Sequence, residues 1–149
     1  MKPLTAGVTR ANEGLDSISW NILGQTYVPK SLSEESFSWH ATFPPGTFVP
    51  PHIHTTQDEF IYMLEGRLDL VLDGAESHAL PGDLIRLPRN VPHGLFNKSE
   101  STVKCLFWVA PTARLYDLGA ESGRCRGALG QARGRFPAAA ARRRLTPTG

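Results

Sequence analysis

The chain has 149 residues, of which 40% are hydrophobic and 20% charged, and its formal net charge is +2. This length suits one domain with one core, because domains commonly span about 100–150 residues. No segment approaches the roughly 18 apolar residues of a membrane span, and the N-terminus lacks the apolar centre of a signal peptide. We therefore expect a soluble, cytoplasmic protein without a membrane partner.

The net charge combines two unlike segments. Residues 1–118 carry 9 basic and 13 acidic side chains, whereas residues 119–149 carry 7 arginines and a single glutamate. The second segment has too few apolar side chains larger than alanine to offset the entropy cost of ordering it. We expect residues 119–149 to form a disordered basic tail. Because aromatic residues are not interleaved with its arginines, we do not expect a nucleic-acid partner.

The first 118 residues predict a series of short β-strands. The first predicted strand spans residues 18–23, and residues 36–43 alternate apolar and polar side chains as a half-buried strand does. Similar runs span residues 60–64, 68–72, 84–87, 92–96 and 103–109. Turn signals separate them, among them Pro44-Pro45-Gly46, Pro50-Pro51, Asp73-Gly74 and Pro81-Gly82-Asp83. Many short strands at this spacing predict an all-β, antiparallel sandwich or barrel.

Two sets of residues recur at characteristic spacings. The first, with intervals of five, one, four and six residues, is Gly46, His52, His54, Glu59 and Gly66. The second, with intervals of five, one, two and three residues, is Gly82, Pro88, Asn90, His93 and Asn97. They resemble the two motifs of the cupin superfamily, G(X)5HXH(X)3-4E(X)6G and G(X)5PXG(X)2H(X)3N. Asn90 stands where the family has glycine, and asparagine is the substitute that best tolerates a positive φ.

The resemblance implies a double-stranded β-helix, also called a jelly-roll barrel, over residues 36–118. Residues 1–35 then form an N-terminal segment, and the basic tail follows the barrel. Similar cupins are commonly homodimers joined by N-terminal strands, and residues 18–23 could supply such a strand. We therefore expect a homodimer.

The spacing of the motif residues independently predicts a metal site. His52 and His54 are two residues apart, so in a strand both imidazoles point to the same face. Glu59 would lie on the opposite face of an unbroken strand, so the polar residues 55–58 should turn the chain and return it beside the histidines. His93, after Pro92, can complete the set from across the barrel. Three imidazoles and one carboxylate suit one divalent transition metal: Fe, Mn, Ni, Cu, Co or Zn.

The same residues lead to three hypotheses for function. The first is a non-haem metal-dependent dioxygenase, similar to quercetinase-like cupins, that acts on a small enolic, diketone or aromatic substrate. It favours Fe(II) and gives Glu59 a second role as general base. The second is a non-redox isomerase, lyase or decarboxylase that uses the metal as a Lewis acid. The third is a module that binds a small ligand without catalysis.

Strand periodicity predicts which side chains surround the metal site. Ile61 and Met63 share the face of Glu59, while Leu95 and Asn97 share the face of His93. An interior of this kind suggests an apolar or aromatic substrate, and the scarcity of Lys and Arg on the inward faces argues against a phosphorylated sugar.

Four further polar residues receive less specific predictions. Gln57 and Tyr62 could donate hydrogen bonds to a bound ligand, although a structural role is the more ordinary expectation. His40 faces solvent or the substrate mouth, and His78 lies in a polar turn with no role in the chemistry. Neither of the last two belongs to a motif.

Overall fold

The computed structural model describes residues 2–117 and Gly119. A short 3₁₀ turn at Leu15–Ser17 precedes the β-strands of this part of the chain. The strands are β1 (Trp20–Ile22), β2 (Gln25–Leu32), β3 (Phe37–Phe43), β4 (Phe48–His52), β5 (Asp58–Glu65), β6 (Leu68–Leu72), β7 (Ala75–Ala79), β8 (Leu84–Leu87), β9 (His93–Phe96) and β10 (Val103–Ala110). Apart from Gly119, the predicted basic tail lies outside the described residues.

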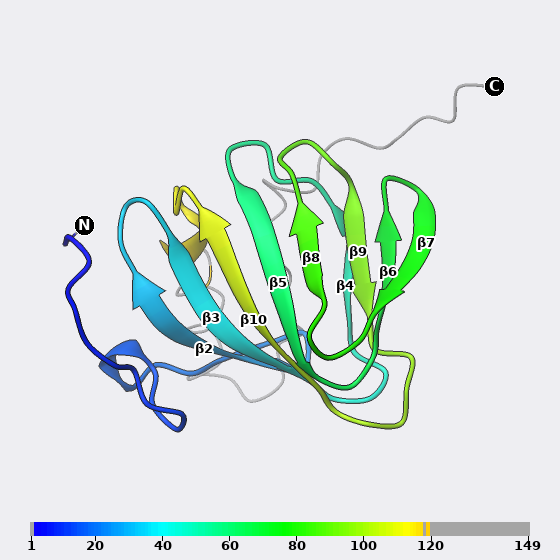
Figure 1. The fold of residues 1–149 in the computed structure, drawn as a ribbon, viewed down its shortest axis with the longest axis horizontal. Helices are drawn as coiled ribbons and strands as arrows, with labels where there is room; N and C mark the ends of the chain where they lie inside the picture. Colours follow the sequence, from blue (N-terminus) through cyan, green and yellow to red (C-terminus); the bar gives the residue numbers. More distant parts are fainter. Residues whose placement is uncertain (1, 118, 120–149) are drawn as a thin grey trace.

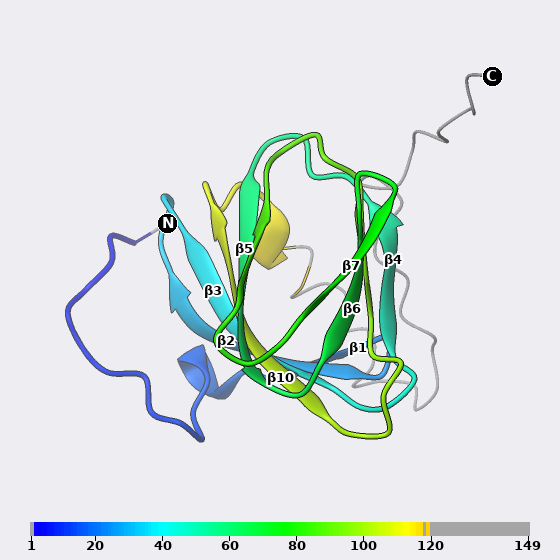
Figure 2. The ribbon, with the colours of Figure 1, turned by 45° about the vertical axis from the view of Figure 1, so that its right-hand side comes forward.

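The strands form two antiparallel sheets that face each other across a shared interior (Figures 1 and 2). One sheet has the order β1-β2-β3-β10-β5-β8, and the other has the order β4-β9-β6-β7. Strands distant in the sequence are neighbours, since β10 lies between β3 and β5, and β9 lies between β4 and β6. The fold is the predicted all-β, antiparallel jelly roll. No helix in residues 2–117 is long and apolar enough to cross a membrane.

Alternating side chains give the large sheet one buried and one outward face. In β3 and β10 every second residue is buried. The two strands pair with Phe107 opposite Trp39, so the buried side chains of both strands share the inner face. The rings of Phe37, Trp39 and Phe107 stack in succession, with centroids 4.8 and 5.1 Å apart. This aromatic row forms one wall of the interior.

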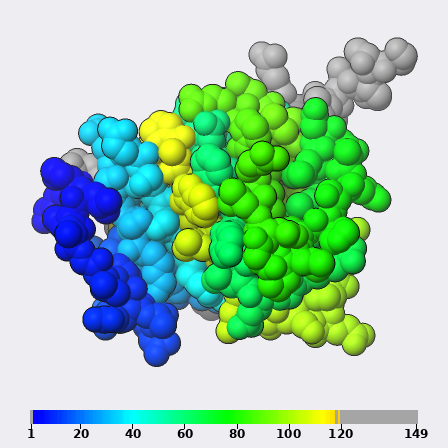
Figure 3. Space-filling view, in the orientation of Figure 1, coloured from blue at the N-terminus to red at the C-terminus, as the bar shows by residue number. Residues whose placement is uncertain are grey.

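The outward face of the same sheet also carries aromatic residues. Phe60 of β5 and Trp108 of β10 stack there with ring centroids 5.3 Å apart. Figure 3 shows the surface above these strands, with β10 in yellow between the cyan of β3 and the green of β5. Leu106 and Tyr62 form the next residue pair along the same outward face.

All seven predicted strands coincide with observed ones, and residues 68–72 and 84–87 have the predicted bounds. β2, β4 and β7 lie outside the predicted set. Pro50 and Pro51 do not form the turn that they signalled but lie inside β4, where the register against β9 shifts between Val49 and His52. A sheet edge or a bulge is, however, where prolines without an N–H group are expected. Because β4 is an edge strand, the missing N–H groups of its prolines break no continuous ladder.

The other two unpredicted strands have similar explanations. β2 contains Pro29, and its register against β3 shifts between Pro29 and Ser31. β7 is a polar edge strand with four exposed residues, which pairs with β6 through a tight hairpin. His78 lies in this strand opposite Asp69, so its predicted place in a turn is wrong.

The N-terminal strand pairs within its own chain in this structure. β1 and β2 form a hairpin with Trp20 opposite Tyr27, and the turn residues Leu23 and Gly24 both have positive φ. The segment before the hairpin contacts Lys30 of β2, whose Nζ donates hydrogen bonds to the backbone carbonyls of Arg10, Ala11 and Glu13. The exchange of this strand in a homodimer stays a prediction.

Candidate metal centre

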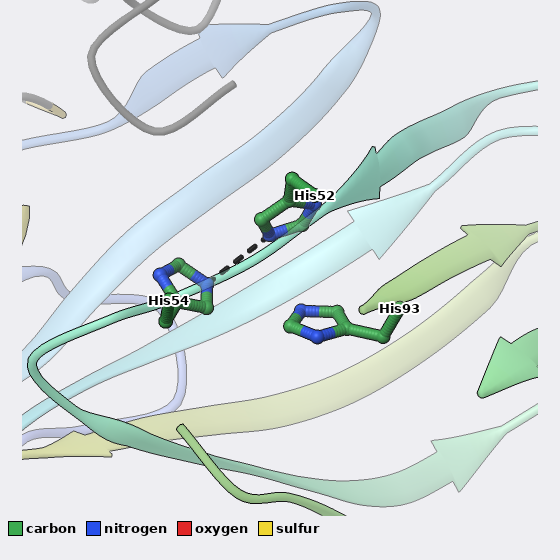
Figure 4. Close-up of side chains that lie close together, drawn as sticks. All are labelled: His52, His54 and His93. Carbon is green, nitrogen blue, oxygen red and sulfur yellow. Dashed lines mark hydrogen bonds between the residues drawn. The ribbon is translucent and has the colours of Figure 1, made fainter. Parts of the chain in front are cut away.

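Three histidines converge inside the barrel (Figure 4). His52 ends β4, His54 follows in the loop, and His93 begins β9. His52 lies opposite His93 in the sheet, which brings their ring centroids to 4.3 Å. The Nε2 atoms of His52 and His54 are 3.1 Å apart, and one nitrogen from each of the three rings lies within 4.8 Å of the others. The structure therefore brings the predicted trio together.

Backbone carbonyls orient two of these rings. His52 Nδ1 lies 2.8 Å from the carbonyl oxygen of Pro50, and His93 Nδ1 lies 3.1 Å from that of Val91. A proton on each Nδ1 satisfies these carbonyls and leaves Nε2 as the nitrogen with a lone pair. His93 is 1% exposed, and its Nε2 has no hydrogen-bond partner among the described residues. A buried imidazole nitrogen in this state fits a metal ligand.

Glu59 joins the cluster from the neighbouring sheet. It lies near the start of β5, after residues 53–57 have turned the chain as predicted. Its Oε2 atom is 3.0 Å from His54 Nε2, and its Oε1 atom is 3.9 Å from His93 Nε2. The carboxylate is 4% exposed. Three imidazoles and a carboxylate thus form one buried group of donors.

His52, His54 and Glu59 of the donor cluster line a cavity that is partly open to solvent. The other walls are aromatic and aliphatic side chains from both sheets and from the segment after β10. They are Trp20, Ile22, Tyr27, Phe37, Trp39, Val49, Leu95, Phe107 and Leu115, together with Gly119. None of the described residues that line the cavity is a lysine or an arginine. The predicted apolar, aromatic interior is therefore present.

The family comparison agrees with the geometry. A model of the cupin domain matches residues 39–109, which include every histidine and carboxylate of the cluster. Residues 39–109 are a cupin domain. This identity accounts for the agreement between the motif spacings and the observed site, because both motifs meet where β4, β5 and β9 approach one another.

Curated relatives share part of this cupin. "Polyketide synthase CurC" of Streptomyces cyaneus is 33% identical over 76 residues, which cover 50% of this chain and 49% of the relative. "Quercetin 2,3-dioxygenase" of Bacillus subtilis is 35% identical over 57 residues, which cover 38% of this chain and 17% of the relative. The chain spans 49–62% of the length of the three relatives that match it first.

Solved structures match the barrel over larger spans. KdgF from a Halomonas species aligns over 75% of this chain and 99% of its own, with a TM-score of 0.65 and 18% identity. That likeness concerns the fold alone. A protein titled as a sugar phosphate isomerase from a cupin superfamily, from Silicibacter pomeroyi, is 27% identical over 60% of each chain, with a TM-score of 0.55.

The four cluster residues of this cupin differ in their affinity for protons. Burial, followed by the charge of His93, lowers the pKa of His52 to about 4. Burial also lowers the pKa of His93. For His54, burial acts to lower the pKa, but the hydrogen bond and charge of Glu59 outweigh it and raise the pKa. Burial alone would raise the pKa of Glu59, but the hydrogen bond from His54 and the charges of the histidines lower it.

These shifts describe a cluster that is largely prepared for a metal. At neutral pH, His52 and His93 are neutral imidazoles and Glu59 is ionised, which are the ligand forms that a divalent cation needs. The raised pKa of His54 means that any proton held between its Nε2 and Glu59 must leave before His54 can bind a cation.

Two contacts join the loops that carry the ligands. The backbone N–H of Asn90 donates to the carbonyl oxygen of His54 at 2.7 Å, and Asn90 has a φ of 67°. Asparagine thus occupies the motif position of glycine with the positive φ that we predicted. Next to it, Asp58 Oδ1 accepts hydrogen bonds from the backbone N–H of Arg89 at 2.9 Å and from its Nε at 3.3 Å. The loop before His93 is therefore fixed to the loop around His54.

The predicted neighbours of the ligands separate into lining and core residues. Leu95 lines the cavity as predicted. Ile61 and Met63 are inward and fully buried but belong to the core beside the cavity. Asn97 is also buried, and its Nδ2 donates to the carbonyl oxygen of Phe43. It has a structural role.

The less specific predictions divide in the same way. Gln57 is buried, and its Nε2 donates to the carbonyl oxygen of Thr112, so it has a structural role. Tyr62 is 41% exposed on the outward face, because it lies three residues beyond Glu59 on β5, so it does not take the possible ligand contact. His40 also lies on the outward side, opposite Leu106 of β10.

Several cavity residues were not predicted from the sequence. Trp20, Tyr27 and Leu115 come from β1, β2 and the segment after β10, all outside the two motifs. The alternation of Trp20, Asn21 and Ile22 carried the relevant signal, since the first and third side chains are buried and line the cavity. Gly119, assigned to the tail, also lines the cavity. An added Cβ there would lie 2.6 Å from the ring of Trp20.

Proposed function

We propose that this cupin is a non-haem metal-dependent dioxygenase that acts on a small enolic, diketone or aromatic substrate. The observation that carries the proposal is a buried cluster of three imidazoles and one carboxylate on the wall of an otherwise aromatic cavity. The relative named as a quercetin 2,3-dioxygenase supports a dioxygenase reaction on an aromatic substrate that carries oxygens.

In this proposal His52, His54, Glu59 and His93 hold one divalent metal. Imidazole and carboxylate ligands together suit Fe(II), which we favour, and they also accept Mn, Ni, Cu, Co or Zn. When bound, a redox-active metal supplies electrons to O2 and polarises a substrate oxygen. The carbonyls of Pro50 and Val91 keep two of the imidazoles in the ligating tautomer.

Glu59 is also our candidate for the catalytic base. An enol or phenol must lose a proton to become an electron-rich substrate, and Glu59 is an ionised, buried carboxylate beside the site. Because His54 Nε2, 3.0 Å away, is itself a ligand in this proposal, the proton that Glu59 accepts resides on the carboxylate. Proton transfer of this kind typically contributes about 10²–10⁴-fold to a rate.

The cavity walls provide apolar surface for a planar substrate. Phe37, Trp39 and Phe107 present a row of stacked rings, and aromatic side chains favour offset or edge contacts with further rings. Oxidation of an electron-rich substrate by O2 benefits from apolar surface of this kind, because it limits the contact of reactive species with water.

A second candidate is a non-redox isomerase, lyase or decarboxylase. The solved structure titled as a sugar phosphate isomerase, at 27% identity, favours it. The absence of Lys and Arg among the described lining residues argues against a phosphate group, so this candidate would act on an unphosphorylated carbonyl compound. A third candidate is a domain that binds a small ligand without turnover.

Oxygen consumption tests the three candidates. Protein purified without an affinity tag is first analysed for metal, and then a panel of diketones, flavonols and catechols is added in an oxygen electrode. A dioxygenase consumes O2 with substrate loss, and the His93→Ala variant does not. Turnover of carbonyl compounds without O2 would support the second candidate, and metal-dependent ligand binding without any turnover would support the third.

A further inference from the structure

One polar atom of a residue that lines the cavity has no role in the site described so far. Trp39 lies in β3, is 6% exposed, and lines the cavity between the rings of Phe37 and Phe107. Its indole Nε1 is buried and has no hydrogen-bond partner among the described residues. An indole nitrogen can only donate a hydrogen bond, so it lacks an acceptor.

Such atoms are rare in this molecule. In the part of the chain that the structure describes, only Trp39 Nε1 and His93 Nε2 are buried side-chain nitrogens or oxygens without a hydrogen-bond partner. A metal accounts for His93 Nε2. A buried donor without an acceptor carries a desolvation penalty, so an unpartnered one in a residue that lines a cavity indicates a partner that the protein itself does not supply.

The neighbouring polar groups make their hydrogen bonds elsewhere and do not supply that acceptor in the structure. The ring of Tyr27 lies 6.2 Å from that of Trp39, but its hydroxyl donates to Gln25 Oε1 at 2.6 Å. Gln25 in turn donates from Nε2 to the carbonyl oxygen of Phe48. The hydrogen bonds run from Tyr27 through Gln25 to the backbone of Phe48, and none of them includes Trp39.

We infer that Trp39 Nε1 donates a hydrogen bond to an oxygen of the bound ligand. The inference rests on the proposed function, in which a ligand oxygen binds at the metal. It adds that the ligand carries a second oxygen acceptor, a carbonyl, ether or hydroxyl, at a distance from the first. Between the two oxygens the ligand is apolar and flat, since the walls there are the rings of the aromatic row. Trp39 is then a specificity-determining residue that selects this second oxygen.

Matched pairs of chelating probes test the inference. 4-Acetylcatechol and 4-ethylcatechol have nearly the same shape, but only the acetyl group has a carbonyl acceptor. Flavonols with a 4′-acetyl or 4′-ethyl group provide the same pair on a longer scaffold. Binding to the Zn(II)-loaded protein is measured for each probe, and the preference for the acetyl member is the ratio of the two Kd values.

The comparison is made between the unaltered protein and Trp39→Phe, which keeps an aromatic ring but removes the donor and part of the ring volume. We expect the preference for the acetyl member of at least one pair to fall by about tenfold in the variant. Comparing ratios cancels the different acidities of the probes. Trp108→Phe, the same change on the outward face, should leave the ratio unaltered. Equal ratios for both scaffolds in the unaltered protein and Trp39→Phe would overturn the inference.

A second measurement does not depend on a core substitution. The chain has three tryptophans, and their indole ¹H–¹⁵N signals in the Zn(II)-loaded protein can be assigned with single Trp→Phe variants. The acetyl probe should move the Trp39 indole proton downfield, whereas the ethyl probe should not. The same response to both probes would contradict the inference. If neither probe binds in a metal-dependent way, the proposed function itself has failed.

Discussion

The inside and the outside of the barrel carry the same kinds of residue in different surroundings. Phe107 and Trp108 are consecutive in β10, and each belongs to a stacked aromatic pair: Phe107 with Trp39 inside, and Trp108 with Phe60 outside. Histidines are divided in the same way, since three lie in the buried cluster whereas His40 and His78 lie outside it. The residue type therefore does not decide the role. Burial and the partners of each side chain do.

Replacing the two consecutive aromatic residues by alanine tests this comparison most severely. Phe107→Ala should lower the free energy of unfolding by about 3–5 kcal/mol, because the side chain is 3% exposed and its loss leaves a hole in the aromatic row. Trp108→Ala removes a larger but half-buried side chain and should cost about 1–2 kcal/mol. Urea unfolding of both variants provides the measurement. Equal losses would mean that the outward pair is covered by something in solution.

The two groups of histidines give the next largest expected effect. His93→Ala should weaken metal binding by more than about 100-fold, because an outer group cannot replace a ligand that the barrel holds in place. His40→Ala, the matched change on the outward face, should leave binding unaltered. Metal content after purification and competition with a chelator measure both. A fully loaded His93→Ala protein would show that the ligand assignment is wrong.

Any proton held between His54 and Glu59 makes metal binding depend on pH. Because the pKa of His54 is raised, metal affinity should increase with pH until that proton is lost, and binding below this point should release about one proton. His52, with a pKa of about 4, and His93, whose pKa is also lowered, release none near neutral pH. Calorimetry in buffers of different ionisation enthalpy counts the protons.

Glu59→Gln is the control for this prediction. It removes the carboxylate that raises the pKa of His54, so proton release near neutral pH should disappear while metal affinity falls about tenfold. Unchanged proton release in the variant would show that another group holds the proton.

The sequence predicted those parts of the molecule that local patterns determine. The alternation in residues 36–43 and the motif spacings predicted the fold, the histidine trio and the position of Glu59. Local patterns did not predict features that depend on the place of a strand in its sheet. Pro50 and Pro51 are tolerated within β4 only because it is an edge strand with a shifted register.

The cavity walls were beyond local patterns for a related reason. Trp20 and Tyr27 line the same cavity as the donor cluster only because β1 and β2 extend the large sheet around the interior. Periodicity shows which side chains share a face. It does not show which of them meet across the barrel, so the unpartnered nitrogen of Trp39 could be recognised only in the structure.

The smallest expected effects concern the loop that supports the cluster from outside. Asn90→Gly should leave stability within about 0.5 kcal/mol, because glycine adopts the φ of 67° without strain. Asn90→Val places a β-branched side chain at the same φ and should cost about 1–2 kcal/mol. Since the N–H of Asn90 holds the carbonyl of His54, the strained variant should also weaken metal binding several-fold. A stability loss in Asn90→Val with unaltered metal affinity would show that this outer loop does not position the donor cluster.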